Sequence, residues 1–314
     1  MPDYIHQPVM LREVLEWLNP RDGAVYVDGT AGGGGHSVAI LEASGPTGRL
    51  WAFDRDGEAV QAVHERLRDY SERVEIVRSN FDRMAEVVPA GTVTGVLLDL
   101  GVSSPQIDQA GRGFSFLQDG VLDMRMDRRG GVTAAQLLNE RSAEELAQIF
   151  WENADERDSR RIARAIVAAR SVRPFVGTQQ LAELVERVCP RRGRKAHPAT
   201  RVFQALRIEV NDEIGSLRRG LVAAMTVLAD RGRLLVITFD SLADRVTKGF
   251  FRDEAREYEV IGDVDVPMLR RPRAPRAKVL TRRSVMPRES EVMENPRARS
   301  AQLRVLEKLG NGVE

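Results

Sequence analysis

The chain has 314 residues, of which 42% are hydrophobic and 30% charged, and its formal net charge is +1. These values are typical of a soluble globular protein with one large domain or two ordinary ones. No stretch reaches the length of a membrane span and residues 1–4 do not begin a signal peptide, so we expect a cytoplasmic protein.

Cysteine and histidine usage also excludes some kinds of site. Cys189 is the only cysteine, so an internal disulfide and a cysteine-based zinc site are excluded. The four histidines are scattered and show no metal-ligand spacing. We therefore expect no metal.

The first predicted elements surround a glycine-rich loop. An amphipathic helix comes first, with an apolar face formed by Val14, Leu15 and Leu18. The apolar run 24–27 predicts a strand and 37–43 predicts a helix, and between them residues 28–36 read Asp-Gly-Thr-Ala-Gly-Gly-Gly-Gly-His. Such a turn lets the backbone approach a ligand and points N–H groups at a carboxylate or phosphate.

The loop does not match two common nucleotide-binding patterns. No register supplies the G-x-G-x-x-G of dinucleotide sites, and no lysine before position 195 could complete a Walker loop. A second predicted strand, 49–53, ends at Asp54, whose carboxylate could accept from both hydroxyls of a ribose. This arrangement fits S-adenosylmethionine. The alternative is a structural turn in which Asp54 is the N-cap of the next helix.

The later elements predict an α/β sheet that is interrupted by a helical block. A helix at 57–69 and strands at 74–77, 95–100, 233–239 and 302–307 belong to the sheet. The interruption contains four predicted helices, at 134–139, 144–151, 160–169 and 179–188. We therefore divide the chain into a first part of the sheet domain at 1–108, an inserted helical domain at 109–209 and a second part of the sheet domain at 210–314.

Asp99 ends the fourth strand and should face the same crevice as the glycine loop. An exocyclic amine is a poor nucleophile, and a carboxylate or carbonyl that accepts its N–H protons would assist its methylation. Methylation at carbon would call for a nearby cysteine, and Cys189 lies in the insert, so nitrogen is the expected target. The alternative is that Asp99 is a strand-end cap.

Two basic clusters suggest contact with a polyphosphate backbone. One lies at 191–195, and the other runs from Arg270 to Arg283 without an acid. The alternative interpretation is that both clusters are solvated loops.

Several blocks of the chain carry a resemblance to a known family. They are Asp28-Gly29-Thr30 with Gly34-Gly35-His36-Ser37, the run 98–106, Gly113-Phe114-Ser115-Phe116 with 122–127, His197-Pro198-Ala199-Thr200-Arg201 and Asn295-Pro296-Arg297-Ala298-Arg299-Ser300. From His6 to about Arg304 the chain resembles the MraW-type (RsmH) methyltransferases. That family methylates N4 of a cytosine in the decoding region of bacterial 16S ribosomal RNA.

The resemblance implies a Rossmann-like class I S-adenosylmethionine-dependent methyltransferase sheet, with the helical insert as substrate-recognition domain. Its implied partner is 16S rRNA, within the small ribosomal subunit or an assembly intermediate. The implied cofactor-binding residues are Gly34, Gly35, His36, Asp54, Phe81, Asp99 and Gln106. From the residues alone, Phe81 would be a core aromatic or would lie against an adenine.

The chain departs from the family pattern at two places. Asp240 stands where the family has histidine, and Asn153-Ala154 replace Tyr-Gly. We therefore assign no catalytic base. Two other functions stay open, a methyltransferase for another RNA position or a small molecule and a non-catalytic ribosome assembly factor.

Overall fold

A computed structural model describes residues 8–191, 196–262 and 264–310 of the chain. The chain divides into two compact units, Met1–Gly101 with Gly215–Glu314, and Val102–Ile214. The range predicted for the insert, 109–209, lies inside the second unit. No helix within the described ranges is long and apolar enough to cross a membrane.

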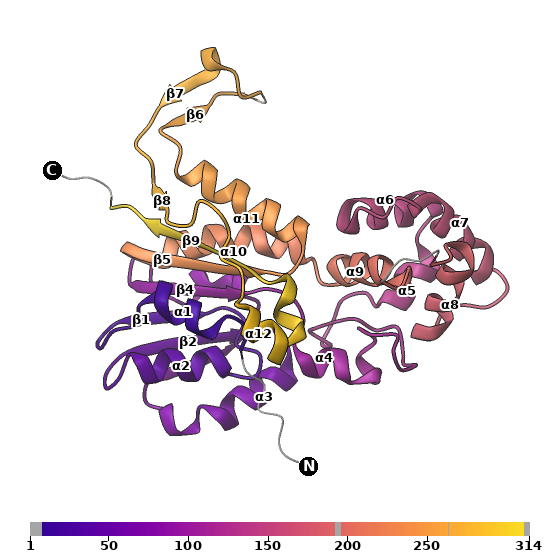
Figure 1. Ribbon diagram of the computed structural model, residues 1–314, viewed down its shortest axis with the longest axis horizontal. Helices are drawn as coiled ribbons and strands as arrows, with labels where there is room; N and C mark the ends of the chain where they lie inside the picture. Colours follow the sequence, from indigo (N-terminus) through magenta and orange to yellow (C-terminus); the bar gives the residue numbers. More distant parts are fainter. Residues whose placement is uncertain (1–7, 192–195, 263, 311–314) are drawn as a thin grey trace. The chain divides into compact units, whose positions relative to one another are not determined.

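The first unit contains a seven-stranded sheet with the order β3-β2-β1-β4-β5-β9-β8 (Figure 1). Strands β1 to β5 pair in parallel, whereas β9 is antiparallel to both β5 and β8. The strands are β1 (Val25–Asp28), β2 (Arg49–Asp54), β3 (Val74–Arg78), β4 (Val93–Asp99), β5 (Leu228–Thr238), β8 (Ala277–Val279) and β9 (Gln302–Lys308). The strands predicted at 24–27, 49–53, 74–77, 95–100, 233–239 and 302–307 are confirmed, with ends that differ by two residues or fewer, except that β5 begins five residues earlier than predicted.

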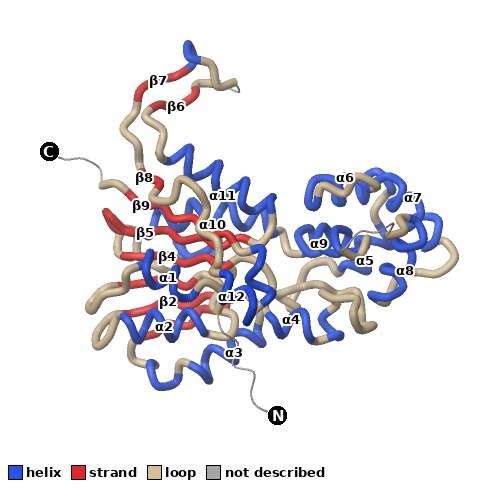
Figure 2. The backbone as a smooth tube through the Cα atoms, viewed as in Figure 1, coloured by secondary structure: helices blue, strands red, loops and turns tan. Residues whose placement is uncertain are grey.

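Helices cover both faces of this sheet, which explains why its central strands are almost continuously apolar (Figure 2). On one face, Tyr26, Leu50 and Leu97 pack with side chains of the first three helices in a single buried cluster. The helices of this unit are α1 (Leu11–Leu18), α2 (Gly35–Ala43), α3 (Gly57–Arg66), α10 (Glu213–Val227, from Gly215 onward), α11 (Ser241–Glu254) and α12 (Glu289–Glu294). A separate hairpin, β6 (Tyr258–Val260) with β7 (Arg270–Pro272), extends away from the sheet.

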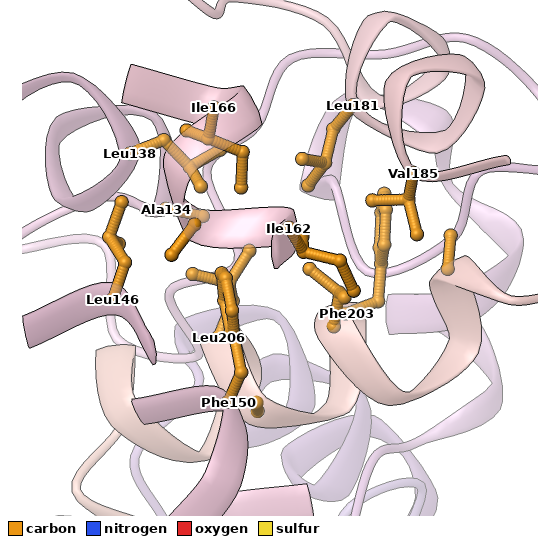
Figure 3. Close-up of a cluster of buried hydrophobic side chains, with 14 of the residues drawn as sticks. Ala134, Leu138, Leu146, Phe150, Ile162, Ile166, Leu181, Val185, Phe203 and Leu206 are labelled. Carbon is orange, nitrogen blue, oxygen red and sulfur yellow. The ribbon is translucent and has the colours of Figure 1, made fainter. Parts of the chain in front are cut away.

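The second unit is helical and has its own core. Its helices are α4 (Ser104–Asp108), α5 (Ala134–Glu140), α6 (Ala143–Ala154), α7 (Ser159–Arg170), α8 (Thr178–Val188) and α9 (Ala199–Val210). Figure 3 shows that α5 to α9 all contribute to one apolar cluster, including Ala134, Leu146, Ile162, Leu181 and Phe203. The four helices predicted in this region are confirmed.

Capping boxes start two of these helices where the sequence predicts them. Thr133 accepts a hydrogen bond from the N–H of Gln136 at 3.2 Å, and Gln136 Oε1 accepts from the N–H of Thr133 at 2.9 Å. Ser142 and Glu145 form the same reciprocal pair before α6. Each pair satisfies backbone donors that a helix N-terminus otherwise leaves without partners.

Gly220 allows α10 to pack against the ring of Phe81. A Cβ at this position would lie 2.3 Å from Phe81 Cε2. Alanine adds up to about 1 kcal/mol of helix propensity, but a forced contact in a packed core costs about 1–3 kcal/mol. We expect Gly220→Ala to lower the free energy of unfolding by about 1–2 kcal/mol in urea denaturation.

Gly249→Ala in α11 is the matched control, because no atom other than the adjoining backbone of the same helix lies within 4 Å of the added Cβ. This variant should raise the free energy of unfolding by up to about 1 kcal/mol. Equal stabilisation by both substitutions would contradict the packing of Phe81 on Gly220.

Candidate functional site

The strand order of the sheet reverses between β1 and β4, and ligands of open α/β sheets bind at such a point. Asp28 ends β1 and Asp99 ends β4. Two hydrogen bonds join the segments after these strands: Gly29 N–H donates to Leu97 O at 2.9 Å, and Asp99 N–H donates to Thr30 Oγ1 at 2.7 Å. The glycine loop and Asp99 therefore lie at one edge of the sheet, as predicted.

The buried carboxylate of Asp28 holds the glycine loop in shape. Its Oδ1 accepts from Thr30 N–H at 3.1 Å, and its Oδ2 accepts from the hydroxyl of Ser37 in α2 at 2.7 Å. Burial raises the pKa of Asp28, whose side chain is inaccessible to solvent. The sequence analysis assigned no role to Thr30 and Ser37. Their hydroxyl side chains, close in sequence to an aspartate at a strand end, were the feature that could have indicated these hydrogen bonds.

The loop leads directly into the positive end of α2. Gly32 and Gly34 have φ values of 53° and 75°, in the left-handed region that glycine adopts without strain. Val38 N–H donates to Gly34 O at 2.9 Å. The amide groups of Gly35, His36 and Ser37 precede this bond and project from the helix N-terminus, where they favour an anionic group.

The buried His36 and the half-buried Asp99 form a polar pair with unsatisfied buried atoms. His36 Nε2 lies 3.6 Å from Asp99 Oδ2. Both ring nitrogens of His36 and Asp99 Oδ1 are buried without a hydrogen-bond partner among the described residues. Because such groups cost free energy when they stay unpaired, these atoms are suited to bind a polar ligand.

Asp54 closes the glycine loop from the end of β2. Its Oδ2 accepts from Gly32 N–H at 2.9 Å and its Oδ1 accepts from Asp56 N–H at 2.8 Å. Burial raises the pKa of Asp54 from 3.8 to about 6. The N-cap of α3 is Asp56, whose Oδ1 accepts from Glu58 N–H at 3.1 Å. The alternative interpretation of Asp54 as that N-cap is therefore wrong.

Phe81 and Gln106 have structural roles that differ from those of the loop residues. Phe81 is buried at the start of a 3₁₀ turn (Phe81–Glu86), between Gly29 and Gly220. Gln106 belongs to the second unit, where its Oε1 accepts from Ser103 N–H at 3.1 Å as part of a capping box. The structure thus brings Gly34, Gly35, His36, Asp54 and Asp99 together around one loop, while the role of Gln106 stays a prediction.

The two departures from the family pattern have structural roles in this chain. Asp240 is the N-cap of α11, and its Oδ1 accepts from Leu242 N–H at 3.0 Å and Ala243 N–H at 2.9 Å. Asn153 in α6 donates to the carbonyl of Ala205 in α9 at 3.3 Å. Both side chains stabilise local structure.

Three of the seven basic side chains in the run from Arg270 to Arg283 pair with carboxylates. Ion pairs join Arg270 to Asp265 at 2.7 Å, Arg271 to Glu259 at 3.7 Å and Arg276 to Glu254 at 2.6 Å. In the other predicted cluster Arg191 pairs with Glu186 at 3.0 Å, and residues 192–195 lie outside the described ranges. The first run is therefore neutralised in part.

The fold is Rossmann-like and of the class I methyltransferase type. This follows from the strand order, from the antiparallel strand β9 beside β5, and from the glycine loop at the point where the strand order reverses. The chain belongs to the MraW methylase family, whose model matches residues 3–309.

Among described side chains, no group of three or more His, Cys, Asp or Glu residues could hold a metal ion.

Curated relatives match along almost their whole length. The chain is 45% identical over 313 residues to the ribosomal RNA small subunit methyltransferase H of Heliobacterium mobile, covering 98% of this chain and 100% of the relative. Identity to the protein of the same name from Syntrophotalea carbinolica is 49% over 309 residues, with 97% and 98% covered. A solved S-adenosylmethionine-dependent O-methyltransferase from Thermotoga maritima is 12% identical, with a TM-score of 0.43 and coverage of 98% and 69%.

The raised pKa of Asp54 predicts a specific pH dependence of stability. The folded state binds a proton at this carboxyl up to about pH 6, whereas the unfolded chain releases it near 3.8. The contribution of Asp54 to stability therefore decreases as the pH rises between these values. Compared with Asp54→Asn, which does not titrate, the wild-type protein should lose stability over this range in urea denaturation. If the free energy of unfolding had the same pH dependence in both proteins, the raised pKa of Asp54 would be contradicted.

Proposed function

We propose that this protein transfers a methyl group from S-adenosylmethionine to the exocyclic N4 of a cytosine in the decoding region of 16S rRNA. The observation that carries the proposal is the set of unsatisfied buried atoms on His36 and Asp99 beside the glycine loop. Membership of the MraW methylase family and the names of the relatives support the choice of reaction and of ribosomal RNA.

The residues present fit the cofactor. The helix N-terminus at Gly35 and His36 offers N–H donors to its carboxylate, and Asp54 offers acceptors to the ribose hydroxyls. The buried unpaired atoms of His36 and Asp99 are consistent with a polar ligand here. When bound, the cofactor supplies an electrophilic methyl group. Phe81 would border the adenine with the small part of its ring that stays exposed.

Asp99 is the residue that we propose to assist the target amine. Its Oδ1 is free to accept an N–H of the amine, which would localise the nitrogen lone pair. Its negative charge would also stabilise the nitrogen as that atom becomes cationic. His36 Nε2 lies 3.6 Å from Asp99 Oδ2, beyond hydrogen-bond distance, so it too is available to a polar ligand.

The proposed substrate also sets the partners and the location. The helical unit, Val102–Ile214, would recognise the RNA. The RNA would be presented by the small ribosomal subunit or an assembly intermediate, and the reaction would take place in the cytoplasm.

The most direct test is mass spectrometry of nucleosides from small-subunit RNA of a strain that lacks this protein. We expect loss of N4-methylcytidine and its restoration by the wild-type gene. Retention of that nucleoside with loss of another methylated one would assign a different acceptor. An unchanged set of nucleosides would point to a non-catalytic assembly factor.

Asp54→Ala tests the ribose contact. Because a hydrogen bond to a charged group is worth roughly 1.5–3 kcal/mol, S-adenosylmethionine affinity should fall about ten- to a hundredfold in calorimetry. Wild-type affinity should also decrease below about pH 6, since the ionised carboxylate is the acceptor. Asp69→Ala, on the surface of the same unit, is the control and should bind normally. Unchanged affinity in folded Asp54→Ala would remove Asp54 from the site.

Asp99→Asn separates assistance of the amine from cofactor binding. The amide keeps the side-chain volume but lacks the negative charge, so the single-turnover rate at saturating cofactor should fall by roughly 10²–10³. Cofactor affinity, measured on the same preparation, should fall less. A normal saturated rate with weakened binding would make Asp99 a cofactor ligand only.

A further inference from the structure

Four exposed arginines lie at the start of α7 in the helical unit and line one groove. Arg160, Arg161 and Arg164 belong to the helix at the spacing i, i+1, i+4, which places them along one side of it, and Arg157 lies two residues before the helix begins at Ser159. The opposite face of α7, with Ile162, Ala163 and Ile166, is buried in the core of the unit. The arginines are therefore a surface feature that the fold of this unit orients outward.

Acidic side chains compensate this arginine face only in part. Arg161 pairs with Asp158 at 3.3 Å and also donates to Cys189 Sγ at 2.9 Å. Arg157 and Arg160 have no ion pair among the described residues. In the groove that these arginines line, the carboxylates are Glu144 and Asp158, so positive charge is in excess.

The groove lies between α6 and α7, which are packed side by side (Figure 1). Its volume is about 1010 Å³, and small side chains, Ala143 and Ala147, line it beside the arginines. Trp151 stands at its edge with 54% of its surface exposed. A second hollow of about 760 Å³ lies on the other side of Trp151, lined by Thr200, Arg201 and Gln204 among others.

We propose that this groove binds single-stranded RNA, with a base stacked on Trp151 and the backbone phosphates on the α7 arginines. An exposed aromatic ring beside arginines is the combination that single-strand binding requires, because every base has a π-face and every nucleotide a phosphate. Only unpaired bases can reach the ring, so a duplex fits poorly. The inference rests on the proposed function and names the surface that holds the RNA outside the methyl-transfer site.

The test measures the binding of a fluorescein-labelled 12-nucleotide single-stranded RNA to the full-length protein by anisotropy at several salt concentrations. Trp151→Ala should weaken binding about five- to a hundredfold, and Trp151→Phe should restore most of the affinity. Arg157→Gln with Arg160→Gln should reduce the slope of log affinity against log salt by about 0.7 for each lost contact. Cofactor affinity and melting temperature should stay at the wild-type values in all three variants.

Matched controls lie elsewhere on the same unit. Val172→Ala removes another exposed apolar side chain, and Arg173→Gln with Arg187→Gln removes two exposed arginines outside the groove. These controls should bind the single strand as the wild type does. An equal loss of affinity in the arginine controls would mean unspecific attraction and would overturn the proposal.

Two further outcomes would also overturn the proposal. They are wild-type RNA affinity in Trp151→Ala and equal affinity for a duplex of the same sequence. Failure of the proposed function is distinguishable, because the wild-type protein would then neither bind S-adenosylmethionine nor methylate RNA. If the wild-type protein binds S-adenosylmethionine and methylates RNA but the groove variants bind RNA normally, only the proposal about the groove is contradicted.

Discussion

The carboxylate of Asp28 is the contact on which the candidate site depends. It bonds to Thr30 N–H and to the Ser37 hydroxyl, so it joins the end of β1 to the first turn of α2. Thr30 in turn accepts from the N–H of Asp99 at the end of β4. A buried carboxylate is costly unless it is hydrogen-bonded, so this network is held in one arrangement. The glycine loop obtains its shape from that arrangement.

Polar groups around the loop fall into satisfied and unsatisfied sets. Asp28 and Asp54 use both carboxylate oxygens in bonds to the protein, and they stabilise the loop before any ligand is bound. His36 and Asp99 keep buried atoms without partners in the described structure. This contrast is expected of a site that is preorganised by one set of residues and completed by a ligand at the other.

Charge in this protein is organised by the tertiary structure and not by the order of residues alone. The run from Arg270 to Arg283 contains no acid, yet Glu254, Glu259 and Asp265 pair with three of its seven basic side chains. On α7 the arginines are interrupted by other residues along the chain, but they gather on one helix face beside Trp151. The helical unit therefore carries a basic surface that the order of residues alone does not reveal.

The sequence by itself determined six of the seven strands of the sheet, the helical interruption and the places of Asp28, Asp54 and Asp99, because these follow from local hydrophobic period and from strand ends. Only the tertiary structure decided which side chains meet. Phe81 packs on Gly220, and Arg276 pairs with Glu254. It also decided that Asp56, rather than Asp54, caps α3. Such choices depend on distances between elements remote in the chain and on competition between neighbouring acceptors, which no local pattern encodes.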